Sequence, residues 1–335
     1  MLRTICIIAI SSPLFGLVPA AAHAQEDARQ WSERGPVSAY SINGPWRPGP
    51  RLDSARAGLA GVVHDGVIYA AGGAGLVEPR NDFEALEPDD GAWRARAPLA
   101  LGLERFGMVS ADGRIWIAGG YSSESRGAPI AEMWSYDPES DVWQGEPAMP
   151  AAKASFSLIE SGGMLYAVGG EDGATDMYVF DLNAREWTTL AAPLETGRRG
   201  AAAVRIDSRI WLAGGSRDGE TSARVDIYDL EAGEWRRGPD LPQPRAGHAM
   251  VALNGAIHIL GGRSSDMRQT LRDHLVLDAG ASGWRQGVAL PATRTEAAAV
   301  ALGGEIWLIG GGAGAGFFAP FTAVDTVDVL DRPAR

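Results

Sequence analysis

The sequence predicts an all-β fold in which the chain closes into a six-bladed β-propeller, with four antiparallel strands in each blade. Two repeating features support this. A strand-like apolar run ends in a glycine pair six times, at intervals of 45 to 50 residues, and the first glycines are Gly72, Gly119, Gly169, Gly214, Gly261 and Gly310. A tryptophan recurs with almost the same period, at Trp46, Trp93, Trp143, Trp187, Trp235 and Trp284. A sequence repeat of this length indicates one supersecondary unit per repeat, stacked against its neighbours.

Each unit reads as four short strands. In the fourth unit these are residues 200–206, 209–215, 223–230 and 234–239, separated by polar or glycine-rich turns. The first strand of every unit is small and apolar, as in "GLAGVV" and "GAAAVR", which suits six innermost strands crowded around one axis. The glycine pair allows close approach of backbones, and the tryptophan supplies a large face to bury between blades.

Three features in one order carry a resemblance to a known family. The glycine pair, the aromatic-aspartate step of "SYDP", "VFDL" and "IYDL", and the tryptophan that follows resemble the kelch repeat from Trp46 to the C-terminus. The resemblance implies a kelch-type propeller. It implies little about function, because one propeller fold is used by enzymes, adaptors and scaffolds.

The repeats do not align as six continuous units. Trp46 has no glycine pair before it, and the unit of Gly310 has no tryptophan after it. We therefore expect a composite last blade, with three strands from the C-terminus and an outer strand around Trp46 from the N-terminus. This closure defines the predicted propeller domain as residues 46–335.

The first residues predict export. One arginine, a short apolar run and "AAAHAQ" are typical of a secretory signal peptide over residues 1–24, cut after Ala24. Cys6, the single cysteine, would leave with this leader, so no disulfide is expected in the mature chain. Residues 25–45 are interpreted as an N-terminal arm or linker. We expect a soluble monomer in the periplasm or outside the cell, with no integral membrane contact.

Charge limits the class of partner. The formal net charge of −12 argues against a nucleic-acid binder, which needs a broad basic surface. A basic residue nevertheless stands just before the first strand of every unit, at Arg56, Arg105, Lys153, Arg198, Arg245 and Arg294. Five of them precede their glycine pair by 16 residues, whereas Arg105 precedes its own by 14, in a unit that looks shortened. This register predicts a ring of cations at one mouth of the channel, where an anion is favourable.

The kelch resemblance adds residues to this predicted ligand site. In kelch adaptors that capture acidic peptides, the corresponding cations and the residue after the glycine pair contact the partner. Carried over, this implies contacts from Tyr121, Ser216 and Arg263, with Arg199 and Arg217 close by. Glu171 and Ala74 depart from the pattern, since one would repel an anion and the other offers no side-chain hydrogen bond. A structural reading stays open, in which the cations bond carbonyls or acids within the blades.

The sequence offers little for catalysis. No "GxSxG" elbow or phosphate loop is present, no histidine has metal-ligand spacing, and the mature chain lacks the cysteine that kelch-type copper oxidases use. We therefore expect no cofactor and no metal. One enzymatic alternative remains, a mutarotase or epimerase for an acidic sugar such as N-acetylneuraminate. Arg198 and Arg245 would hold the carboxylate and Glu171 would transfer a proton.

The function predicted from the sequence is that of a binding or scaffold propeller. It would recognise an acidic peptide, glycan or protein at the arginine-rimmed mouth. A third reading is a structural protein with partners along the blade edges, which requires no chemistry at the mouth.

Overall fold

The computed structural model describes residues 44–75, 78–125, 127–170, 176–193, 197–266, 268–314 and 322–331. Residues 37–335 form one compact unit. The predicted leader and residues 25–43 of the predicted arm lie outside the described residues, so both stay predictions. No helix in the described part of the chain has the length and apolar composition needed to cross a membrane.

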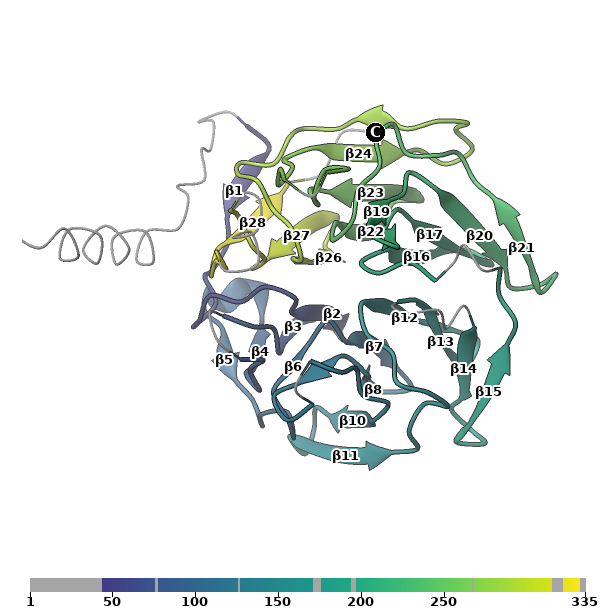
Figure 1. The fold of residues 1–335 in the computed structure, drawn as a ribbon. Coiled ribbons are helices and arrows are strands. Elements are labelled where there is room, and N and C mark those ends of the chain that lie inside the picture. The colour runs from purple at the N-terminus through teal and green to yellow at the C-terminus, as the bar shows by residue number, and fades with distance from the viewer. Residues whose placement is uncertain are drawn as a thin grey trace, which may run out of the picture. The chain divides into compact units, whose positions relative to one another are not determined.

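Six four-stranded antiparallel sheets form the blades, as the sequence predicted (Figure 1). Blade 1 contains β2 (Ala60–His64), β3 (Val67–Ala71), β4 (Phe83–Leu86) and β5 (Arg94–Ala95), and blade 2 contains β7 (Gly107–Ala111), β8 (Arg114–Ala118), β10 (Met133–Asp137) and β11 (Val142–Glu146). Blade 3 contains β12 (Phe156–Ser161), β13 (Met164–Gly169), β14 (Met177–Asp181) and β15 (Glu186–Leu190), and blade 4 contains β16 (Ala202–Ile206), β17 (Arg209–Ala213), β20 (Val225–Asp229) and β21 (Glu234–Arg237). Blade 5 contains β22 (Ala249–Leu253), β23 (Ala256–Leu260), β24 (His274–Leu277) and β25 (Arg285–Gln286), and blade 6 contains β26 (Ala298–Leu302), β27 (Glu305–Ile309), β28 (Val327–Leu330) and β1 (Trp46–Pro48). A 3-10 turn, η1 (Pro88–Asp90), lies between β4 and β5.

Blade 6 is the predicted composite. Strand β1 pairs antiparallel with β28, with Trp46 opposite Leu330. The Gly49 amide donates to the Val327 carbonyl at 2.8 Å and extends this pairing. The N-terminal strand therefore completes the last sheet, which leaves no open blade in the wheel.

The six innermost strands touch in a closed circle, because β26 contacts β2 as β2 contacts β7. A ring of backbone hydrogen bonds reinforces this circle just before the innermost strands. Each of six residues donates its amide to the carbonyl of its counterpart in the preceding blade, at 2.7–3.3 Å. We call these the collar residues: Gly58, Arg105, Ser155, Gly200, Gly247 and Glu296. All six have left-handed backbone, with φ between 52° and 68°.

The glycine pairs mark a second ring of hydrogen bonds. The second glycine of each pair donates its amide to the next blade, at 2.7–3.3 Å, and the accepting carbonyls belong to Leu103, Lys153, Arg198, Arg245, Arg294 and Arg56. A side chain has no room there: a Cβ on Gly214 would lie 2.6 Å from the Arg245 carbonyl oxygen. The glycine pairs recur in the sequence because the backbones of adjacent blades come too close there for a side chain.

The tryptophan series ties the outer strands together. Five of the six indoles donate Nε1–H to a carbonyl of the preceding blade at 2.8–3.2 Å, and the acceptors are Pro50, Ala97, Pro147, Pro239 and Val288. Trp235 differs, since its buried Nε1 has no partner among the described residues. Apolar residues of adjacent blades fill the spaces between the sheets. For example, the ring centroids of Trp116 on β8 and Phe180 on β14 are 5.8 Å apart.

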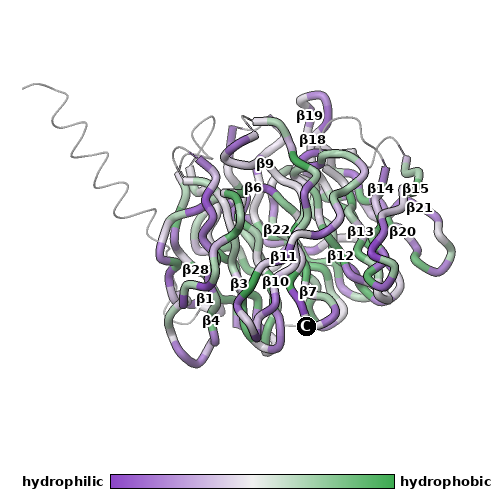
Figure 2. Tube along the Cα trace, turned by 90° about the horizontal axis from the view of Figure 1, so that it is seen from below, coloured by the Kyte–Doolittle hydropathy of each residue, from purple (hydrophilic) through white to green (hydrophobic). Residues whose placement is uncertain are grey.

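Two small sheets stand apart from the blades. β6 (Leu103–Glu104) pairs with β9 (Tyr121–Ser122), and β18 (Ser216–Arg217) pairs with β19 (Glu220–Thr221). Figure 2 shows both on the same side of the ring. These elements follow the glycine pairs or precede the first strands, so they surround one mouth of the channel.

Candidate functional site at the channel mouth

The predicted cation ring differs from the structure at five of its six positions. The side chains of Arg56, Lys153, Arg198, Arg245 and Arg294 are 0–2% exposed and lie inside the blades. They do not rim the mouth, so the prediction of a six-membered basic rim is wrong. The structural reading that the sequence left open describes them correctly.

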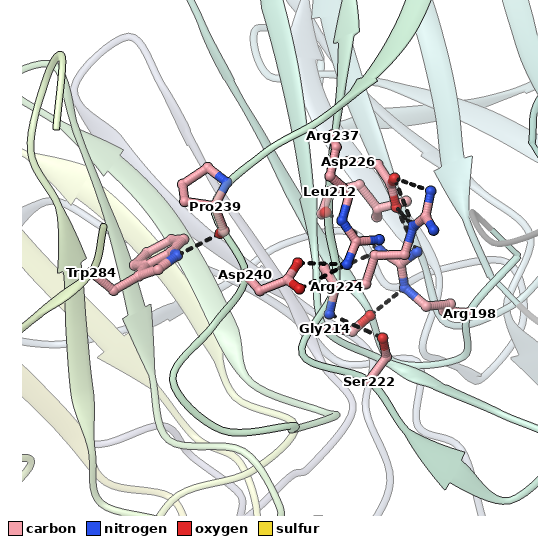
Figure 3. Close-up of polar contacts among 10 residues, drawn as sticks. All are labelled: Arg198, Leu212, Gly214, Ser222, Arg224, Asp226, Arg237, Pro239, Asp240 and Trp284. Atoms are coloured by element: carbon pink, nitrogen blue, oxygen red, sulfur yellow. Dashed lines mark hydrogen bonds and ion pairs between the residues drawn. The ribbon is translucent and has the colours of Figure 1, made fainter. Parts of the chain in front are cut away.

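Arg198 shows what these residues do (Figure 3). Its guanidinium donates to the Gly214 carbonyl at 2.5 Å and to Asp226 Oδ2 at 2.7 Å. Asp226 lies on β20, is 2% exposed, and also accepts from Arg224. The arginine therefore fastens the glycine pair of its blade to the third strand, in an environment where an unpaired charge would be costly.

The same contact recurs around the wheel. Each buried cation reaches the carbonyl of its own first glycine, an acid near the third strand, or both. The acidic partners are Glu84 for Arg56, Asp273 for Arg245 and Asp328 for Arg294.

In blades 2 and 3 an aromatic residue of the third strand, Trp134 or Tyr178, holds the position that Glu84 and Asp226 hold in blades 1 and 4, and the arginine is replaced as well. In blade 2 the corresponding position holds Leu103, which is fully buried, and β10 places Trp134 opposite Ile117. In blade 3 Lys153 lies 5.1 Å from the Tyr178 ring centroid, and desolvation lowers the pKa of Lys153 to about 8. The replacement of this third-strand acid together with the arginine fits a structural pair and not a ligand site.

Arg105 is not the blade 2 counterpart of the buried cations, and the unit of blade 2 is not shortened as the sequence suggested. Leu103 holds the position equivalent to the buried cations, and Arg105 is a collar residue. Three collar residues are glycines and one is serine, so Arg105 and Glu296 are the two with long side chains. Gly58 separates them in the ring, and the missing side chain there lets them meet.

The two arginines Arg105 and Arg263 converge on Glu296. Arg105 donates through Nη2 at 2.8 Å and Nε at 3.3 Å to Glu296 Oε2, while Arg263 Nη2 bonds Oε1. These side chains are 12–18% exposed, so the contact is screened only partly by water. Burial by itself would raise the pKa of the Glu296 carboxyl, but Arg105 and Arg263 outweigh burial and lower that pKa.

A cavity of about 880 Å³ opens at this mouth. Its wall includes residues from all six innermost strands, and its rim includes Ser216 and Gly219 of the β18–β19 hairpin. The charged side chains on its wall are Arg105, Arg199, Arg217, Arg263, Asp218 and Glu296, which gives 4 − 2 = +2. The mouth is therefore locally basic in a chain of net charge −12.

The structure brings together only part of the predicted site. Arg105, Ser216 and Arg263 reach the cavity, as do the neighbouring Arg199 and Arg217. Tyr121 is 9% exposed, pairs with Glu104 in the small β6–β9 sheet, and is not one of the residues that line the cavity. Glu171 lies outside the described residues.

Two of the three residues that the mutarotase interpretation requires are not available at the cavity. Arg198 and Arg245 are buried in their blades and bonded to Asp226 and Asp273, so they are not placed to hold a sugar carboxylate in the cavity.

Sequence reasoning missed Glu296. The repeat nevertheless marks this residue. The residues two positions after the five buried cations are Gly58, Ser155, Gly200, Gly247 and Glu296, and Arg105 holds the equivalent position in blade 2. Glycine, which suits left-handed backbone, holds three of these six positions, and Arg105 and Glu296 are the two charged residues among them.

His248 is the second residue that the sequence analysis left unassigned. It lines the cavity at 5% exposure, and neither ring nitrogen has a partner within the described part of the chain. Desolvation, with Arg245 and Arg198 nearby, lowers the pKa of His248 to about 3, so the ring is neutral at ordinary pH. Phe106 and Phe156 occupy the same position in their blades, which identifies His248 as a packing residue.

Residues 155–330, more than half of the chain, match the KLHDC2/KLHL20/DRC7 Kelch-repeats domain, and residues 104–150 match the Kelch motif. The chain belongs to the kelch-repeat family.

Similar proteins support the same assignment. Kelch-like protein 35 of Mus musculus is 29% identical over 230 residues, which cover 67% of this chain and 38% of that protein. Beta-scruin of Limulus polyphemus is 26% identical over 231 residues, which cover 62% of this chain and 25% of that protein. A solved structure titled "Structure of YjhT" superposes with a TM-score of 0.73 at 17% identity, covers 84% of this chain and 97% of that one, and shows the shared fold. The chain spans 38% of the length of Kelch-like protein 35 and 25% of that of beta-scruin, and these comparisons show its family and fold.

Proposed function

We propose that this kelch propeller is an exported binding protein that recognises an acidic peptide segment of a partner at the channel mouth. The observation that carries the proposal is the convergence of Arg105, Arg199, Arg217 and Arg263 around one cavity with a local charge of +2. Guanidinium groups bind carboxylates through paired hydrogen bonds, and several of them around a concave surface select for a chain with repeated acidic groups.

The size and character of the cavity support a peptide. A volume of about 880 Å³ is large enough for several side chains, and the small residues of the innermost strands leave its centre open. Arg199 is exposed and Arg217 is half-buried on the β18–β19 hairpin, so both are accessible from the solvent. Their charge would also steer an acidic partner to the mouth in a protein that otherwise repels it.

A labelled hexaglutamate peptide tests the proposal. We expect Arg199→Ala and Arg217→Ala each to weaken binding by about tenfold, or about 1.4 kcal/mol, because each removes a charge-assisted contact. Raising the salt concentration should weaken binding to the unmodified protein. The matched control is Arg285→Ala, which removes an equally charged residue bonded to Asp278 away from the mouth, and should leave affinity unchanged.

A hexalysine peptide completes the test. Equal affinity for hexalysine and hexaglutamate, or equal affinity of all three arginine variants for hexaglutamate, would remove the acidic-peptide site from consideration.

A further inference from the structure

Glu296 already occupies the place where two arginines of the mouth converge. Arg105 comes from the segment before β7 in blade 2, and Arg263 follows β23 in blade 5, while Glu296 precedes β26 in blade 6. Both oxygens of one carboxylate are used, Oε2 by Arg105 and Oε1 by Arg263. The pair of guanidinium groups is thus arranged to hold a carboxylate, and the chain itself supplies one.

The fold does not require a carboxylate at this position. The collar uses only the amide and carbonyl of residue 296, which donate to and accept from Gly247 and Gly58. The backbone there is left-handed, with φ of 52°, a conformation that costs about 1–2 kcal/mol for a residue with a Cβ. Glycine holds the equivalent position in blades 1, 4 and 5. A charged residue kept in a strained conformation within a cavity is typical of a functional position.

We propose that Glu296 is an internal competitor that fills an anion subsite formed by Arg105 and Arg263, and so sets how strongly a partner's acidic groups bind at the mouth. The inference rests on the proposed function and specifies its selectivity. A partner's carboxylate must displace an intramolecular one, which competes at a high effective concentration. Weakly acidic segments would be excluded, whereas a segment with several acidic groups could open the subsite.

The geometry also fixes the direction of the effect. Burial at the mouth leaves Glu296 12% exposed, and Arg199 adds to the positive field around it. Removing the Glu296 side chain leaves Arg105 and Arg263 facing the cavity without this carboxylate, while Glu104, with Oε1 3.7 Å from Arg105 Nη1, still offsets part of the charge of Arg105. An added anion should then bind there more tightly, because like charges gathered in one place repel each other.

The test measures labelled hexaglutamate binding to Glu296→Gly. This variant keeps the collar backbone, because glycine is the residue of the equivalent positions, and we expect at least tenfold tighter binding than in the unmodified chain. Glu296→Gln is the second variant and should give a smaller gain, since an amide oxygen still accepts from one arginine. Adding Arg263→Ala to Glu296→Gly should abolish the gain.

Asp278→Asn is the matched control. It changes the net charge by the same amount at an acid bonded to Arg285 outside the mouth, and should alter affinity by less than twofold. Thermal unfolding establishes that each variant is folded.

The outcomes separate this inference from the proposed function. Binding by the unmodified chain with no gain in either Glu296 variant overturns the inference alone and makes Glu296 a support for the arginines. Binding that appears only in the Glu296 variants supports the subsite but overturns peptide recognition by the native mouth. No binding by any of the proteins overturns both.

Discussion

Arg198→Ala should destabilise the propeller without acting on the mouth. The substitution removes hydrogen bonds to the Gly214 carbonyl and Asp226 and exposes carbonyls of Leu212 and Arg224 to a void. Breaking a buried ion pair by removing one partner costs about 3–5 kcal/mol. Because Arg224 still bonds both Asp226 oxygens at 2.8–2.9 Å, we expect the lower end of this range, about 3 kcal/mol.

Urea unfolding followed by tryptophan fluorescence measures this loss. With an m value of about 3 kcal/mol/M, the midpoint should fall by about 1 M. A double variant, Arg198→Met with Asp226→Leu, should recover most of the loss, because an apolar pair replaces the ion pair much as in blade 2. Affinity for hexaglutamate should stay unchanged in every folded variant. An unchanged midpoint combined with lost peptide binding would refute the assignment of Arg198 as a structural residue.

Three further predictions address packing, pH and catalysis. His248→Phe should raise the free energy of unfolding by about 1–2 kcal/mol, because it removes two buried ring nitrogens that have no partner in the described structure, and thermal unfolding checks this. His258 Nδ1 lies 2.9 Å from His274 Nε2 within blade 5, and burial lowers the pKa of each histidine to about 4. Their neutral forms therefore stabilise the fold above pH 6.5. This contribution, a few kcal/mol, should disappear as the pH falls from 6.5 towards 4, and a His258→Tyr variant should show a weaker dependence in urea unfolding at each pH. Anomer exchange of N-acetylneuraminate in the presence of the protein should proceed at the uncatalysed rate, and acceleration that is lost in Glu171→Gln would return the mutarotase to consideration.

The structure also explains why the cation register misled the sequence reasoning. A constant distance of 16 residues from the glycine pair fixes where Arg198 lies along the chain, but not where its side chain points. That direction depends on an acid 28 residues later, the separation of Arg56 from Glu84 and of Arg198 from Asp226. The same separation joins Arg245 to Asp273, whereas Asp328 follows Arg294 by 34 residues, so this distance was a readable sign of structural pairing in blades 1, 4 and 5.

The sequence marks Glu296 as an unusual residue at its position in the repeat, but it does not reveal the two arginines that Glu296 contacts. Its contact with Arg105 joins residues 191 apart in the sequence, and its contact with Arg263 joins residues 33 apart. Neither distance repeats in other units, so periodicity carries no information about them. They exist because the collar brings blades 2, 5 and 6 around one opening.

The sequence by itself determined the number of blades, the strands within them and the closure by Trp46. These features follow from repeated local requirements: glycine where backbones touch, small residues near the axis, and an indole between sheets. Only the tertiary structure decided which cations are buried and which meet at the mouth, because burial and ion pairing depend on neighbours that closure of the ring alone brings together.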